Sequence, residues 1–263
     1  MGDLEGRVER LRGAADGGDA GAARELGRLL SMLRADVDEQ VEIDEHTWPE
    51  EQWLRAAVQA RPDDRVAAVL LAGRLVQQIA HWSKDPDYAE EHGEDEETLE
   101  RREAEARALY ERVLADDPDD PTARVGLATL VAWAHDGEDN TGGDVLDAEP
   151  PYWFYSVELG MGSGSFNHSE TVITTDLDEA RWALARLLAP VLAEVGGPPL
   201  GVELHLFVHG NGEVQEVVRL DDHLDRDGRV DWDAVTVPPL TGEPLPPGHP
   251  VGVDHYGYST DWG

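Results

Sequence analysis

The sequence predicts an α+β protein in which helical hairpin repeats fill residues 1–150 and a small antiparallel α+β domain fills residues 151–263. Three observations lead to this fold class. One apolar helical pattern with an aspartate-containing turn occurs three times before residue 135. The apolar period changes from 3.6 residues to 2 after Tyr152, as expected where helices give way to strands. Glu149-Pro150-Pro151 lies between the two patterns and predicts a domain boundary.

The clearest helical pattern runs from Ala104 to Ala128. Before its turn, apolar residues recur every three or four positions and form one stripe of a helix: Ala106, Leu109, Tyr110, Val113 and Leu114. The segment Asp117-Pro118-Asp119-Asp120-Pro121 then ends that helix and begins another, because proline cannot continue a helix but fits its first turn. The spacing predicts helices over about 96–115 and 121–134.

The same pattern recurs 56 residues earlier and again 45 residues before that. The small and apolar positions after the three turns align as follows: Ala22, Leu26, Gly27 and Leu30; Ala67, Leu71, Ala72 and Leu75; Ala123, Leu127, Ala128 and Val131. The repetition predicts a helical pair over 5–33, joined at Gly17-Gly18-Asp19, and further helices at about 49–60 and 64–81. Polar, acidic loops are expected at 35–48 and 82–97.

These residues resemble the tetratricopeptide repeat, whose pattern combines small and aromatic residues, an Asp-Pro turn, and then alanine, leucine and a small residue. The Gly-Asp turn of the first pair is similar to that of Sel1-like repeats. The resemblance covers about residues 5–135, and its offsets are longer than the roughly 34 residues of a standard repeat. An unrelated helical bundle with Asp-Pro turns is the alternative.

The resemblance implies a concave groove lined by the first helix of each repeat. Mapped onto this chain, the partner-binding groove comprises Arg24, Arg28, Val66, Val69, Gly73, Val76, Val125 and Thr129. Valines, small residues and two arginines stand out on so acidic a protein, and an exposed apolar patch usually has something to cover it. We expect either a partner peptide or the chain's own C-terminal domain to lie there.

The second domain is expected to have the order strand, strand, helix, hairpin. Alternating residues after Tyr152 and at 171–175 predict two strands, and Asp176 followed three residues later by Glu179 predicts a capped helix. Two further alternating segments at 202–209 and 213–220 predict the hairpin, which a proline-rich tail follows from Pro238.

The register of this hairpin follows from its pattern. A two-residue loop at 211–212 would mix apolar and polar residues on both faces. A three-residue loop at 210–212 pairs Val208 with Val214 and leaves one apolar face that only Glu216 interrupts. We therefore predict the three-residue loop, with Gly212 in the left-handed conformation.

Charge and composition exclude several classes of function. The chain has 56 acidic and 21 basic residues, a net charge of −35, so it repels phosphate backbones and anionic lipid, and direct nucleic-acid binding is not expected. The absence of cysteine excludes disulfides, thiolate nucleophiles and cysteine-ligated zinc. No apolar run reaches 18 residues and no signal-like segment opens the chain, so we expect a cytoplasmic protein without a membrane span.

Two groups in the second domain could carry chemistry. His205 and His209 share a strand face and, with nearby acids, could bind a metal or exchange protons, but they lie roughly 13 Å apart along the strand. The turn containing Asp225, Asp227 and Gly228 resembles the middle of a calcium-binding EF-hand loop, although the acid required at the twelfth position is missing. A solvated sheet face and an ordinary Asp-Gly turn explain the same residues, so no cofactor or metal is expected.

The expected function is therefore non-enzymatic binding of another protein through the repeat groove, with the second domain adding specificity. The first alternative is an immunity or antitoxin protein that neutralises a basic toxin such as a nuclease, because the acidic surface would attract it. The second alternative is an enzyme or metal-binding protein that uses the histidines and aspartates of residues 205–227.

Overall fold

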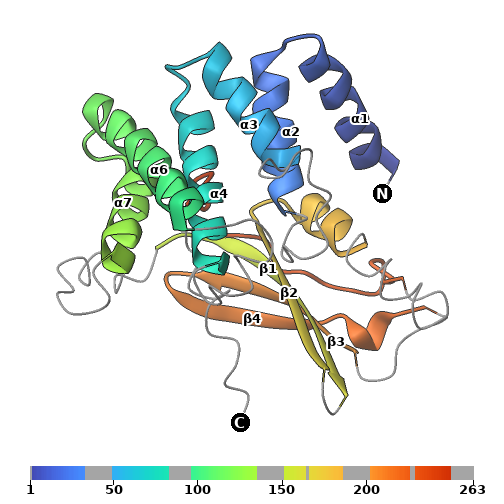
Figure 1. Cartoon of the computed structure of the whole chain (residues 1–263). Helices are drawn as coiled ribbons and strands as arrows, with labels where there is room; N and C mark the ends of the chain where they lie inside the picture. Colours follow the sequence, from blue (N-terminus) through green and yellow to red (C-terminus); the bar gives the residue numbers. More distant parts are fainter. Residues whose placement is uncertain are drawn as a thin grey trace. The chain divides into compact units, whose positions relative to one another are not determined.

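A computed structural model describes residues 2–32, 49–82, 96–134, 151–163, 166–185, 202–225 and 229–249, and it shows an α+β fold (Figure 1). The described residues divide into two compact units. The helical unit holds residues 8–31, 49–82, 96–134 and 246–249. The sheet unit holds residues 2–7, 32, 151–163, 166–185, 202–225 and 229–245. Before residue 135 the described helices are α1 (Gly2–Asp16), α2 (Ala20–Met32), α3 (Pro49–Ala60), α4 (Arg65–Trp82), α6 (Glu96–Asp116) and α7 (Pro121–Ala134).

Helices α2, α4 and α7 all begin with the same aspartate cap. Asp19, Asp64 and Asp120 each precede the first helical residue, and their Oδ1 atoms accept the backbone N–H groups of residues 22, 67 and 123 at 3.0, 3.0 and 2.9 Å. The first N–H groups of a helix have no partner within it, so a side-chain acceptor at this position stabilises each start. Segments 45 and 56 residues apart in the sequence thus adopt the same local structure.

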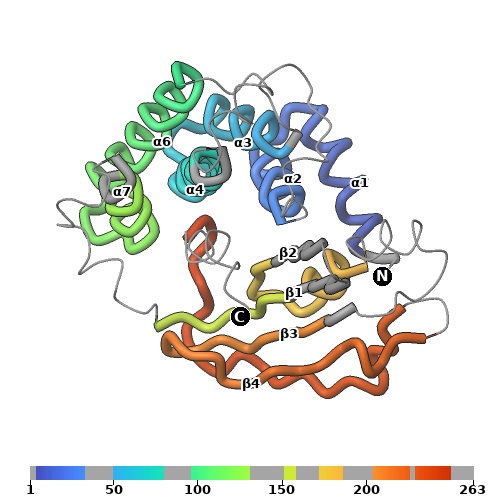
Figure 2. Tube along the Cα trace, turned by 60° about the horizontal axis from the view of Figure 1, so that its bottom comes forward, coloured from blue at the N-terminus to red at the C-terminus, as the bar shows by residue number. Residues whose placement is uncertain are grey.

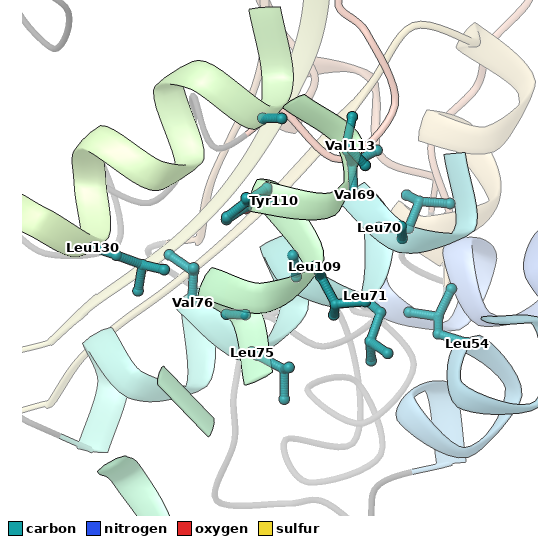
Figure 3. Packing of buried hydrophobic residues seen from close by; sticks show 14 of the residues in the cluster. Leu54, Val69, Leu70, Leu71, Leu75, Val76, Leu109, Tyr110, Val113 and Leu130 are labelled. Atoms are coloured by element: carbon teal, nitrogen blue, oxygen red, sulfur yellow. The ribbon is translucent and has the colours of Figure 1, made fainter. Parts of the chain in front are cut away.

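The core of the helical unit lies between α3, α4, α6 and α7. Its fully buried side chains include Leu54 of α3, Leu71 and Leu75 of α4, Tyr110 of α6 and Leu130 of α7. Figure 3 shows these side chains converging from the four helices. Burial of such side chains contributes about 1.5–3 kcal/mol each, so the apolar stripes supply most of the packing of this unit.

Two glycines set how closely the helices approach. A Cβ atom on Gly27 of α2 would lie 2.6 Å from Cγ of Leu54, and one on Gly126 of α7 would lie 2.2 Å from Cζ of Tyr110. Both distances are far below van der Waals contact. The large side chain of one helix therefore fills the place that a side chain would need on the next.

The sheet unit contains a four-stranded antiparallel sheet in the order β2-β1-β3-β4. Its strands are β1 (Phe154–Ser163), β2 (Phe166–Thr174), β3 (Val202–Gly210) and β4 (Glu213–Arg219). One face of the sheet carries Tyr155, Val157, Val172, Leu204, Leu206 and Val208, all buried. This alternation along each strand matches the period of 2 in the sequence.

The β3–β4 hairpin differs from the register predicted above. His209 pairs with Val214 across a two-residue loop in which Asn211 and Gly212 both have positive φ, and the register then shifts so that Val208 pairs with Glu216. The three-residue loop was therefore wrong, although Gly212 is left-handed as expected. The irregularity moves the strand by one residue, which restores the apolar face after a turn that would otherwise mix the two faces.

A helix at residues 177–185 belongs to the sheet unit. The side chain of Asp176 accepts the backbone N–H groups of residues 178 and 179, as the sequence predicted. Two contacts join this helix to the start of the chain: Trp182 Nε1 donates to Glu5 Oε1 at 3.0 Å, and Arg7 Nη1 lies 3.6 Å from Glu179 Oε1. The kink expected at Pro190 lies outside the described residues.

Among the described helices, none combines the length and apolarity that crossing a membrane requires.

Replacing Gly126 with alanine tests the close approach of α6 and α7. Gly126→Ala should lower the free energy of unfolding by about 1–3 kcal/mol, because the new Cβ overlaps the Tyr110 ring. The measurement is denaturant unfolding followed by circular dichroism. Gly13→Ala is the matched control, since no atom lies within 4 Å of a Cβ there, and should be neutral or stabilising by up to about 1 kcal/mol. Equal stability of the two variants would contradict this packing.

Candidate functional site

The two arginines mapped to the groove are both engaged in ion pairs. Arg24 Nη1 lies 2.8 Å from Oδ2 of Asp64, the carboxylate that also caps α4. Arg28 Nη2 lies 2.8 Å from Oε1 of Glu25 on the same helix. Arg24 thus links α2 to the start of α4, and a similar pair, Arg65 with Asp117 at 2.6 Å, links α4 to the turn before α7.

The mapped residues of α4 form one stripe whose exposure falls along the helix. Val66 is 38% exposed, Val69 is 5% exposed, and Gly73 and Val76 are buried. Residues 66, 69, 73 and 76 are spaced by three and four, so they share one face of the helix. The start of this stripe is therefore open, and its middle and end are covered.

The chain's own residues cover the middle of the stripe. We call Pro246–His249 the tail turn; it belongs to the helical unit. A Cβ on Gly248 would lie 2.9 Å from the carbonyl carbon and oxygen of Val69, and one on Gly73 would lie 2.9 Å from the carbonyl oxygen of Gly248. In Figure 2 part of the red segment lies next to α4. The contact is backbone against backbone, and it needs glycine on both sides.

Local sequence explains the shape of the tail turn. The backbone N–H of His249 donates to the carbonyl oxygen of Pro246 at 3.1 Å, and Gly248 has φ +74°. Proline at the second position and a glycine with positive φ at the third are the residues that a type II turn requires. The turn is therefore favoured by its own residues before it contacts α4.

His249 is half-buried where the tail turn lies. Burial lowers the pKa of His249 from its ordinary 6.5 to about 4, because the imidazolium form loses hydration. The ring is neutral at pH 7. Protonation of His249 therefore opposes the seated position of the turn.

The remaining mapped residues lie on α7. Val125 is half-buried and Thr129 is 5% exposed. The Thr129 hydroxyl donates to the Val125 carbonyl oxygen at 3.0 Å, within the helix. That hydrogen bond occupies the hydroxyl, so Thr129 contributes a methyl group rather than a polar contact to this face.

The histidines of the sheet form part of an aromatic row. The rings of Phe154 and His209 stack with centroids 4.4 Å apart, and Phe207 lies between His209 and His205 at 6.1 and 5.8 Å. Ser156 Oγ lies 2.8 Å from His209 Nε2, a spacing that also occurs in nucleophile and base pairs. The Ser156 side chain is 3% exposed, however, so its hydroxyl orients the ring and offers no surface to a substrate.

The EF-hand-like segment folds as a tight turn where it is described. Leu224 and Val230 form an antiparallel bridge, and the Asp225 side chain accepts the backbone N–H of Arg229 at 2.9 Å. Asp227 and Gly228 lie outside the described residues. Within the described ranges, no three histidine, aspartate or glutamate side chains are grouped closely enough to hold a metal ion.

Sequence reasoning missed a buried network of charged and polar side chains. Glu50 and Arg74 are 0% and 3% exposed and pair at 2.9 Å between α3 and α4. Glu51 accepts hydrogen bonds from Gln78 at 3.1 Å and from Arg55, which also pairs with Glu105 of α6. The signal was present, because residue 50 lies four positions before Leu54 and seven before Ala57 and so shares their buried face. The helix dipole also favours acids in a first helical turn, so the two glutamates did not by themselves indicate a buried network.

The histidine of the tail turn gives a pH prediction. Because its seated pKa is lowered, the seat is fully favoured above about pH 6.5 and is weakened as pH falls toward 4, by up to about 2–3 kcal/mol. The test is an NMR titration of the His249 ring, assigned by its loss in His249→Gln. We expect a midpoint near 4, and a return toward 6.5 in Gly73→Ala, which displaces the turn. A wild-type midpoint near 6.5 would show that the ring is not buried there.

Comparison with known proteins finds no counterpart. No protein-family model, curated protein or solved structure matches this chain. Its function is therefore inferred from its own residues. Among the described residues, the α4 stripe and the tail turn meet in a backbone contact between a helix face and a turn.

Proposed function

We propose that the helical unit is a scaffold of tetratricopeptide-like and Sel1-like repeats that binds another protein through the groove along α4, without catalysis. Three features support the repeat assignment: the equivalent caps at Asp19, Asp64 and Asp120, the small residues where the helices approach, and the ion pairs that link successive turns. A repeat scaffold buries its apolar stripes between neighbours and leaves one face for a partner.

The observation that carries the proposal is the seat of the tail turn. Gly248 rests on the backbone of α4 at Val69, beside the space that Gly73 leaves open. A helix face that accepts a short turn of its own chain has the shape needed to accept a similar turn from a partner. Next to this seat, Val66 remains 38% exposed and provides further apolar surface.

Charge favours a basic partner. The net charge of −35 creates a negative field that attracts positively charged proteins and speeds their encounter at low ionic strength. Apolar contact along α4 then supplies affinity, because exposed rim charges contribute mainly to the association rate. A basic partner with an extended segment is thus the kind of protein that suits both features.

A crosslinking amino acid at Val66 tests the proposal in the full chain. Val66 and Val217 are both exposed valines, at 38% and 48%, and Val217 on β4 serves as the matched control. We expect a protein that crosslinks at position 66 and not at 217. Its binding, measured with purified components, should weaken about tenfold or more in Val66→Arg, since a charge then enters an apolar contact.

Val217→Arg should leave that affinity within about twofold, because rim and surface positions outside an interface contribute little. The opposite result, loss of binding in Val217→Arg with normal binding in Val66→Arg, would place the interaction on the sheet and end the groove proposal.

A further inference from the structure

The tail turn carries information about what the groove can bind. Gly248 has no room for a Cβ, because the Val69 carbonyl atoms would lie 2.9 Å away and the Leu70 nitrogen 3.0 Å away. Its φ of +74° is also one that residues with a side chain rarely adopt. Two independent constraints therefore select glycine at the residue that touches α4.

The seat on α4 is equally restrictive. Gly73 lies one helical turn after Val69, and a Cβ there would meet the Gly248 carbonyl oxygen at 2.9 Å. The missing side chain forms a notch, and the backbone of Gly248 occupies it. The notch therefore selects a thin segment with glycine at its tip.

We infer that the tail turn is an internal ligand of the α4 groove, and that the external ligand is a peptide segment with the same chemistry, a Pro-Pro-Gly-His type II turn, which displaces it. This inference rests on the proposed function and specifies the partner's binding segment. Proline before the glycine pre-forms the turn, so a partner segment of this kind loses little conformational entropy on binding.

The covalent link of the tail turn to the rest of the chain favours it over a free peptide. The tail turn follows Leu245 directly, so its binding is intramolecular and is favoured by an effective concentration on the order of millimolar. A short peptide in solution must overcome that advantage, whereas a whole partner adds contacts such as those at Val66. The groove is thereby closed to weak ligands and open to a partner that contacts both places.

Fluorescence anisotropy with a labelled peptide tests this inference on the full chain. The probe is Leu-Pro-Pro-Gly-His-Pro, the chain's own residues 245–250. Gly248→Val removes the internal competitor, because valine is strained at this φ and overlaps the Val69 backbone. We expect the peptide to bind this variant about tenfold or more tightly than wild type, since a larger fraction of molecules then has an open seat.

Filling the notch provides the control. Adding Gly73→Ala to Gly248→Val should abolish peptide binding, although alanine favours the helix by about 1 kcal/mol over glycine and so preserves folding. A second control peptide with valine in place of glycine should not bind either variant. Thermal melting confirms that each chain is folded, and an ordinary His249 pKa confirms that the turn has left α4.

The outcomes separate this inference from the proposed function. If the peptide binds folded Gly248→Val no more tightly than wild type, or binds equally with the notch filled, the turn is not a groove ligand. If the partner that crosslinks at Val66 nevertheless binds normally, the scaffold function stands and only the ligand chemistry is wrong. If the peptide fails this test and no partner binds through Val66, neither proposal stands.

Discussion

Three large side chains each occupy the space that a Cβ atom would fill on a glycine of a neighbouring segment. They are Leu54, Tyr110 and Trp153. Leu54 does so at Gly27, Tyr110 at Gly126, and Trp153 at both Gly210 and Gly242. Close packing of this kind gains dispersion and apolar burial, and it tolerates no added methyl group without a shift. The same constraint holds where the tail turn meets α4, except that backbone atoms fill the space there.

A buried network of charged and polar side chains adds direction to the packing of the helical unit. The pair of Glu50 with Arg74 and the hydrogen bond of Gln78 to Glu51 add directional polar contacts between α3 and α4. Removing one partner of a buried pair leaves an uncompensated charge and is strongly destabilising. The network therefore fixes α3 against α4, and α4 carries the seat of the tail turn.

Much of the helical unit could be predicted because its signals are local. The stripe before Asp117, the prolines at 118 and 121 and the aspartate caps act within one or two helical turns, so helix positions follow from spacing. The alternation of the sheet could also be predicted from the sequence. The irregularity in β4 could not, because nothing in the pattern distinguishes a two-residue loop with a register shift from a three-residue loop.

The seat of the tail turn and the partners of the buried acids could not be predicted from the sequence, for a different reason. A Pro-Pro-Gly-His segment predicts a turn, but its place on α4 depends on a contact between residues more than 170 positions apart. Likewise, the spacing of Glu50 places it on the buried face of α3 but does not identify Arg74 as its partner. Long-range partners decide both cases, and periodicity carries no information about them.

These contacts divide the α4 stripe into three parts. Its start at Val66 is open, its middle is filled by a turn that glycine alone allows, and its end is buried. In the proposed function, the acidic surface steers basic proteins toward the molecule, and the turn occupies the middle of the stripe when no partner is bound. In that proposal, occupancy by the tail turn and binding of a partner are two states of one surface.

Displacement of the tail turn by a ligand requires that the turn leave α4 while the helices stay folded. Hydrogen exchange at the His249 amide, which donates to Pro246, measures that opening directly. We expect the His249 amide to exchange through a local opening whose free energy is well below that of global unfolding. The core amides of α4 should exchange only when the unit unfolds. If the His249 amide exchanges only with global unfolding, the turn is a permanent part of the core and cannot be displaced by a ligand.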